Sequence, residues 1–202
     1  MKPISTIASL AVPMLYDNID TDTIIPSREM RTTGRTGLAD GLFAPWRYLD
    51  ADRRLRDPRF VLNQRDAIGT RVLLAGKNFG CGSSREHAVW ALAEFGIEAI
   101  IAPSFAPIFR SNCLTNGLLP VVLAGEVVAQ LAWQMLHIDL EAQTVSAGGK
   151  CWQFDIEPEA KQMLFLGLDR VDLSFARLRS AMPRWLRRDR RARPWIYLEK
   201  GR

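Results

Sequence analysis

Apolar runs and helical periodicity alternate along most of this chain. Short apolar runs bounded by glycine or proline are typical of buried strands, and amphipathic segments of nine or more residues are typical of helices. Strands are expected at residues 4–14, 71–75, 97–102, 118–123, 138–145 and 151–156. Helices are expected at residues 86–95, 105–115, 125–136 and 158–166. Gly96, Gly117 and Gly167 follow three of these helices and fit the left-handed position at a helix end.

Strands that alternate with helices predict an α/β fold with a short, mostly parallel sheet and flanking helices. The first strand, together with a hairpin that turns at residues 147–150, adds further β structure. Residues 27–64 break the pattern, because they hold several glycines, two prolines and many charges. A connection of this length in a compact domain is usually functional, so we expect an active-site loop or lid.

The basic charge of the chain is concentrated at its C-terminal end. The sequence has 27 Lys and Arg against 22 Asp and Glu, a net charge of +5. Residues 179–202 hold nine basic and two acidic residues, which leaves residues 1–178 close to neutral at −2. We therefore divide the chain into a domain of residues 1–178 and a basic tail of residues 179–202. The near-neutral body argues against a nucleic-acid-binding module that uses the tail. The tail is then either a solvated end of the chain or a contact with another subunit.

Other classes of protein are disfavoured by what the sequence lacks. No apolar run approaches the ~18–20 residues that a membrane helix needs. The N-terminus does not have the pattern of a signal peptide, and three cysteines do not make a disulfide scaffold. We expect a cytoplasmic protein with reduced cysteines and no membrane partner.

The most informative segment is residues 77–88, KNFGCGSSREHA. It lacks the Gly-Lys-Ser/Thr of a phosphate loop and the third glycine of a dinucleotide-binding turn. Ser83, followed by Glu86 three residues later, predicts a capping box at the start of a helix. Three glycines surround the serines, namely Gly76, Gly80 and Gly82. Glycines suit a close approach between backbone and ligand.

Arg85 would lie in the first turn of that helix, where the macrodipole disfavours a cation. A cation beside free backbone N–H groups makes a binding site for a carboxylate. The same N–H groups would stabilise a serine alkoxide, so a serine there could act as a base. The alternative, on the pattern alone, is that the serines only cap the helix.

Three motifs carry a resemblance to a known family. NFGCGSSREHA resembles the signature of the swivelling domain of the aconitase superfamily, DNIDTDTIIP resembles its opening motif, and APSFAPIFRSNCLTNGLLP resembles its third block. In order and spacing they are similar to the small-subunit family of 3-isopropylmalate dehydratase, in the bacterial form with the loop RTGLADGLFAPWRYLD. The resemblance covers residues 5–175 and implies an aconitase-like swivelling β/β/α domain.

The resemblance implies a hydro-lyase that interconverts 2-isopropylmalate and 3-isopropylmalate by dehydration and rehydration in leucine biosynthesis. It implies activity only in a heterodimer with a large subunit. Ser83 matches the base of the family motif, and Ser84 and Arg85 match positions that bind the carboxylate of the small dicarboxylate substrate. Asp22 resembles an acidic active-site residue, and Arg35 lies in the loop where a second substrate-binding arginine is expected.

No cofactor is expected on this chain. Cys81, Cys113 and Cys151 are far apart and form no Cys-x-x-Cys pair. The resemblance places the [4Fe-4S] cluster and its ligands on the large subunit, so no metal site is expected here. Cys113 and Cys151 are interpreted as structural. Cys81, Gly82 and His87 are expected to support the site from behind the substrate-binding residues, and a Cys81–His87 nucleophile pair is the alternative.

Two points of substrate choice stay open in the sequence. Asp172 stands where the family has a second glycine, which leaves room for a related hydro-lyase that acts on citraconate or dimethylmaleate. Leu38, Leu42 and Phe43 lie in the long loop. They either meet the isopropyl group of the substrate or anchor the loop to the core.

Overall fold

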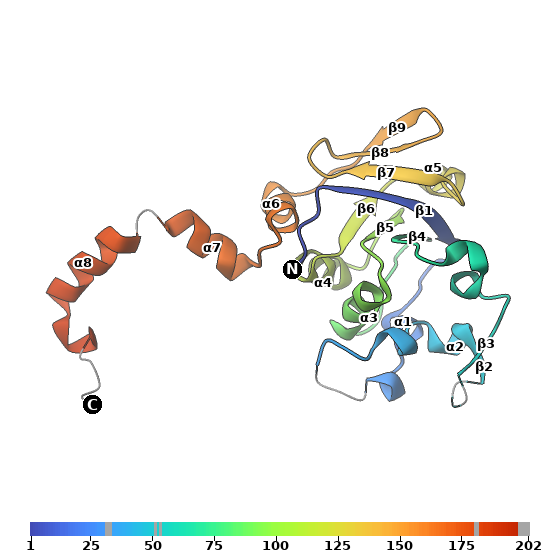
Figure 1. The fold of residues 1–202 in the computed structure, drawn as a ribbon, viewed down its shortest axis with the longest axis horizontal. Coiled ribbons are helices and arrows are strands. Elements are labelled where there is room, and N and C mark those ends of the chain that lie inside the picture. Colours follow the sequence, from blue (N-terminus) through green and yellow to red (C-terminus); the bar gives the residue numbers. More distant parts are fainter. Residues whose placement is uncertain (31–33, 51, 53, 180–181, 198–202) are drawn as a thin grey trace.

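The structure is a computed structural model that describes residues 1–30, 34–50, 52, 54–179 and 182–197. Its main sheet has the strand order β6-β5-β4-β1-β7-β8-β9 (Figure 1). The parallel strands are β6 (Leu119–Val122), β5 (Ala99–Ala102), β4 (Val72–Ala75) and β1 (Thr6–Met14). The antiparallel strands are β7 (Met135–Asp139), β8 (Thr144–Ala147) and β9 (Lys150–Gln153). The predicted α/β fold with added antiparallel strands is confirmed.

The sheet separates two hydrophobic cores. Side chains alternate across a strand, so Val12 and Met14 of β1 enter one core while Ile7 and Ala11 enter the other. Helices α3 (His87–Phe95) and α4 (Pro107–Asn116) pack mainly in the first core. Helices α5 (Gly125–Gln130) and α6 (Pro158–Leu166) pack in the second core (Figure 1). The predicted helix ends are confirmed, because the glycines that follow α3, α4 and α6 have positive φ.

The long segment after β1 is built from short elements rather than from one irregular loop. Leu38, Leu42 and Phe43 are at most 1% exposed and pack in the first core. They therefore anchor the loop and do not face a ligand. The elements are α1 (Thr21–Ile24), η1 (Ser27–Glu29), η2 (Ala39–Gly41), α2 (Ala44–Arg47), β2 (Tyr48–Asp50), β3 (Leu55–Arg56), η3 (Val61–Asn63) and η4 (Arg65–Ala67).

The prediction of a helix over residues 125–136 is wrong in its second half, because α5 ends at Gln130. Trp133 has a φ of +59°, which ends any helical path. Backbone bonds to β1 replace the helix: Trp133 N–H donates to Ala11 O and Ala11 N–H donates to Gln134 O, both at 2.9 Å. Pairing with the central strand β1 therefore outcompetes the apolar periodicity of this segment.

The prediction of a single strand over residues 138–145 is also wrong. The chain reverses at residues 140–143, where Gln143 has a φ of +57°. β7 and β8 lie on either side of this turn and pair antiparallel. The predicted hairpin at residues 147–150 is confirmed as the β8–β9 turn.

The C-terminal segment is helical and projects away from the sheet (Figure 1). It contains α7 (Arg170–Leu178), α8 (Met182–Ala192) and η5 (Pro194–Tyr197). The buried residues of these elements are Leu173 and Asp189. Asp189 accepts hydrogen bonds from Arg193 and, at 2.6 Å, from the Tyr197 hydroxyl, which closes η5 onto α8. Across the described residues, no helix combines the length and apolar character that crossing a membrane requires.

Candidate active site

The candidate site lies where β1 and β4 end side by side. Met14 of β1 pairs with Ala75 of β4 in parallel register, so the segments that follow leave the same edge of the sheet. These segments are residues 15–26 and 76–88, which hold two of the three sequence motifs. Ligands of open parallel sheets bind at this carboxyl edge, which is where the predicted site residues gather.

Backbone bonds hold the two segments together. Gly80 N–H donates to Ile19 O and Thr21 N–H donates to Cys81 O, each at 2.8 Å. Asp20 and Cys81 form an isolated parallel bridge between these two bonds. The opening motif and the glycine-rich motif, about sixty residues apart in the chain, thus form one structural unit.

At two glycines of the turn, other parts of the protein occupy the space that a side chain would need. A Cβ on Gly76 would lie 2.4 Å from Tyr16 O, and one on Gly80 would lie 2.1 Å from Cγ of Phe109. Gly80 also has a φ of +77°, which disfavours any side chain. The expectation that these two glycines admit a ligand is therefore wrong, because the first segment and α4 occupy the space beside them.

Ser83, the predicted base, is held by a threonine that sequence reasoning missed. Ser83 N–H donates to Thr21 Oγ1 at 3.1 Å, and the two hydroxyl oxygens are also 3.1 Å apart. Ser83 is exposed, whereas Thr21 is 1% exposed. Thr21 lies directly before Asp22 in the opening motif, and this position was the one signal in the sequence that could have pointed to Thr21 as a site residue. Its contact with Ser83 depends on the folded pairing of the two segments.

The predicted capping box does not form. α3 begins at His87, four residues after Ser83, and Glu86 stands at the N-cap without a side-chain capping bond. Glu86 instead accepts a hydrogen bond from Asn116 Nδ2 at 3.0 Å. The prediction that Arg85 lies in the first helical turn is wrong, and so is the prediction that helix N–H groups stabilise Ser83.

Arg85 lies beside Asp22 across the two segments. Arg85 Nη1 is 2.5 Å from Asp22 Oδ1, and both side chains are partly exposed. Ser84 is exposed, and its carbonyl oxygen accepts a hydrogen bond from Asn112 Nδ2 of α4 at 3.4 Å. The structure thus brings Ser83, Ser84, Arg85 and Asp22 together at the carboxyl edge of the sheet.

Arg35 lies against α3, apart from this ion pair. Its guanidinium carbon is 5.2 Å from the ring centre of Trp90. The ring of His87, one turn earlier on α3, lies 4.8 Å from the same indole. In the part of the chain that the structure describes, no hydrogen bond or ion pair joins Arg35 to Asp22 or Arg85.

Comparison with known proteins identifies the family. Residues 1–126 match the family described as Aconitase C-terminal domain. The 3-isopropylmalate dehydratase small subunit of Cupriavidus necator is 50% identical over 208 residues, which cover 98% of this chain and all of that protein. The chain belongs to the family of 3-isopropylmalate dehydratase small subunits. The small subunit of Teredinibacter turnerae is 43% identical, over 98% of each chain.

A solved structure of the same family supports the fold. The 3-isopropylmalate dehydratase structure from Methanocaldococcus jannaschii superposes with a TM-score of 0.68 at 29% identity. The match covers 99% of that chain but 88% of this one. The resemblance read from the three motifs is confirmed, and part of this small subunit has no counterpart in the archaeal chain.

The cysteines of this small subunit do not form a cluster site. Among the described residues, no group of three or more His, Cys, Asp or Glu side chains could hold a metal ion. Cys81 Sγ donates to Asn18 O at 3.4 Å. Cys113 is buried, which raises the pKa of its thiol and confirms its structural interpretation. Cys151 lies in a strand, as predicted, but it is exposed on β9 and its structural interpretation stays a prediction.

Glu94 of α3 fastens the long loop at residues 37–39. Its carboxylate accepts backbone hydrogen bonds at 2.7, 2.6 and 3.0 Å from Gly37, Leu38 and Ala39. Burial tends to raise the pKa of Glu94, but the three hydrogen bonds outweigh burial and lower it. Nothing in the spacing of the sequence pointed to Glu94, because the contact joins residues more than fifty positions apart.

The Glu94→Gln variant is expected to loosen this loop at neutral pH. Its loss of stability should be below the ~1.5–3 kcal/mol of a hydrogen bond to a charged group, because the carboxylate is largely exposed to screening. The wild-type pKa is lowered on folding, so the stabilisation is present above the unfolded pKa and is lost as pH falls through the folded value. The advantage of wild type over Glu94→Gln should therefore shrink on acidification.

Limited proteolysis of residues 34–50 and thermal unfolding between pH 7 and pH 3 measure this effect. Glu141→Gln is the matched control, because Glu141 is exposed and its carboxylate makes no hydrogen bond in the described structure. A difference between wild type and Glu94→Gln that grows toward low pH would contradict the assignment.

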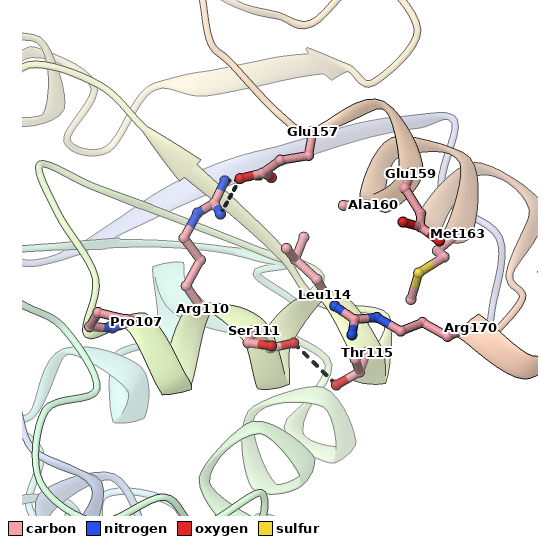
Figure 2. A pocket seen from close by; sticks show the side chains of 10 residues that line it. All are labelled: Pro107, Arg110, Ser111, Leu114, Thr115, Glu157, Glu159, Ala160, Met163 and Arg170. Atoms are coloured by element: carbon pink, nitrogen blue, oxygen red, sulfur yellow. Dashed lines mark hydrogen bonds and ion pairs between the residues drawn. The ribbon is translucent and has the colours of Figure 1, made fainter.

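A pocket between α4 and α6 is separate from the site, since none of the predicted site residues lines it. Its volume is about 290 Å³, and its apolar lining comes from Pro107, Leu114, Ala160 and Met163. Figure 2 shows Arg110 reaching from α4 to Glu157. The two guanidinium nitrogens of Arg110 lie 2.8 and 3.0 Å from the carboxylate oxygens of Glu157. The bonds from Arg110 lower the pKa of Glu157. This ion pair ties α6 to α4.

Proposed function

We propose that this chain is the small subunit of a 3-isopropylmalate dehydratase that interconverts 2-isopropylmalate and 3-isopropylmalate in leucine biosynthesis. The observation that carries the proposal is the 50% identity to a named small subunit across nearly the whole chain. The gathering of Ser83, Arg85 and Asp22 at the carboxyl edge of the sheet supports it independently. As a small subunit, the chain acts in a heterodimer with a large subunit.

Ser83 is the proposed base. Dehydration of a malate removes a weakly acidic proton from a carbon next to a carboxylate, and a positioned base is needed for that step. Ser83 is exposed, so a substrate carbon can approach its Oγ. With Ser83 in its alkoxide form, the proton passes from this carbon to Oγ, which becomes a neutral hydroxyl, and the proton returns to the substrate during rehydration.

Arg85 and Ser84 are the proposed carboxylate-binding residues. A guanidinium has five N–H donors in a planar fork, and the ion pair with Asp22 involves Nη1. Asp22 thus orients Arg85 while other donors can bind a substrate carboxylate. Arg35 is the proposed second cation. Its position over Trp90, an indole that also contacts His87 at the start of α3, supports a place near the site.

The [4Fe-4S] cluster of this superfamily is proposed to lie on the large subunit. The scattered cysteines of this chain do not fit it. Within the heterodimer, this chain then contributes proton transfer and carboxylate binding. The three free thiols suit a reducing compartment, and we place the enzyme in the cytoplasm.

We further propose that residues 1–178 form the swivelling domain, with residues 27–64 as its active-site loop, and that the basic residues 179–202 form a separate segment. Three observations support this division. The family match lies within the first part, the archaeal chain corresponds to 88% of this one, and η5 folds back on α8 instead of on the sheet.

Reconstitution with the cognate large subunit under anaerobic conditions tests the proposed function. The purified small subunit should be colourless and inactive, and the pair should isomerise isopropylmalate. A substrate panel with citraconate and dimethylmaleate separates the related hydro-lyases. A pair that prefers either of these substrates, or a small subunit that is active alone, would contradict the proposal.

A further inference from the structure

Thr21 is the buried residue in closest polar contact with the proposed base. Its Oγ1 lies 3.1 Å from Ser83 Oγ and also accepts the Ser83 N–H at 3.1 Å. Its own N–H donates to Cys81 O at 2.8 Å. Thr21 is 1% exposed. The threonine therefore holds Ser83 at two atoms while its own backbone is tied to the same turn.

The hydroxyl of Thr21 has one proton and two lone pairs. The Ser83 N–H occupies one lone pair. In the neutral state either hydroxyl can donate to the other. When Ser83 Oγ carries negative charge it has no proton, so Thr21 must be the donor. A hydrogen bond to an anion is stronger than one between neutral groups, so this contact favours the charged form of Ser83.

The backbone N–H groups at the start of α3 do not stabilise the charged form of Ser83, because α3 begins four residues after Ser83. The threonine is also held firmly in place. Asp20 Oδ1 accepts the Thr23 N–H at 2.6 Å and caps α1. A Cβ on Gly82 would lie 3.2 Å from Thr21 Oγ1, at a position where φ is +95°. The absence of a side chain at Gly82 thus leaves the two hydroxyls in contact.

We propose that Thr21 is the positioning residue of this enzyme, which orients Ser83 Oγ toward the substrate and donates a hydrogen bond to it when it is charged. The inference rests on the proposed role of Ser83 as the base. Thr21 itself need not touch the substrate, because its buried hydroxyl acts through the exposed serine.

Three variants of the reconstituted heterodimer test this role. Thr21→Val keeps the shape and removes the hydroxyl, whereas Thr21→Ser keeps the hydroxyl. Thr23→Val is the matched control, because Thr23 lies on the same short helix and its hydroxyl makes no hydrogen bond in the described structure. Each variant is assayed for kcat and KM, for assembly by size exclusion and for thermal unfolding. Ser83→Ala is measured in parallel.

Thr21→Val is expected to lower kcat about 10- to 100-fold, near the ~10²-fold effect of removing one donor to a developing anion. KM should change less than threefold, and assembly should persist. Thr21→Ser and Thr23→Val should stay within about threefold of wild type, well short of a lost donor. Equal losses in Thr21→Val and Thr21→Ser, or a kcat near wild type in Thr21→Val, would overturn the inference.

The parallel Ser83→Ala measurement distinguishes the proposed role of Ser83 as the base from the proposed role of Thr21 as the residue that positions it. If Ser83→Ala is inactive and Thr21→Val is active, the base stands and the positioning role fails. If Ser83→Ala is fully active, the proposed base itself fails, and the role of Thr21 fails with it.

Discussion

The Ser83→Ala heterodimer is expected to lose about 10²- to 10⁴-fold in kcat, the usual contribution of a positioned general base. The variant removes the Oγ that would accept the substrate proton and leaves the carboxylate-binding Arg85 beside Asp22. KM should therefore change far less than kcat. Ser83 is exposed, but its Oγ pairs with the buried Thr21 hydroxyl, so its truncation should cost about 0.5–1.5 kcal/mol, the net contribution of one hydrogen bond.

Ser111→Ala is the matched control for this experiment. Ser111 is exposed on α4, and the bond that it makes with Thr115 uses its backbone carbonyl. Steady-state kinetics on the reconstituted pair, with size exclusion to verify assembly, give the comparison. Full turnover in Ser83→Ala would remove the serine from the role of base, even if the chain remained essential to the complex.

Gly80→Ala is expected to cost about 2–5 kcal/mol of stability. The left-handed φ of +77° accounts for about 1–2 kcal/mol of backbone strain in a residue with a side chain. The new Cβ would lie 2.1 Å from Cγ of Phe109, a ring that is 2% exposed and packs edge-on against Phe79. Overpacking of such a core typically adds about 1–3 kcal/mol. For a domain of this size, each kcal/mol corresponds to about 2–4 °C in Tm.

Gly69→Ala isolates the two contributions. Gly69 has a φ of +78°, almost the same as Gly80, and a Cβ there would meet nothing within 4 Å. It should therefore show only the backbone strain of about 1–2 kcal/mol. Urea unfolding of the isolated small subunit measures both variants. Equal losses would mean that the approach of Phe109 does not require glycine at position 80.

The Gly80 variant should also lower the activity of the reconstituted pair. Gly80 N–H donates to Ile19 O, one of the bonds that join the two segments of the site. Displacement of this turn would shift Cys81 and Ser83 relative to Thr21. Stability and activity are thus expected to fall together in Gly80→Ala, whereas Ser83→Ala should lower activity far more than stability.

Much of the fold was predictable because it depends on local patterns. Buried strands such as β4 and β5 are short apolar runs between turn residues, and the glycines after α3 and α4 stop their helices through positive φ. The predictions failed where a distant partner decided the conformation. The segment after Gln130 has apolar periodicity, but bonds from Trp133 and Gln134 to Ala11 of β1 draw it into the sheet.

By itself, the sequence determined the family, the α/β architecture and the residues in which to look for chemistry, because motif order and periodicity are properties of the chain alone. Only the tertiary structure decided how those residues are supported. In the structure, α3 begins after Ser83 and not at it, and Thr21 lies against that serine. The structure also joins Glu94 to the long loop. Both contacts link positions more than fifty residues apart. The first forms because β1 and β4 end at the same edge of the sheet, and the second forms because α3 packs against η2.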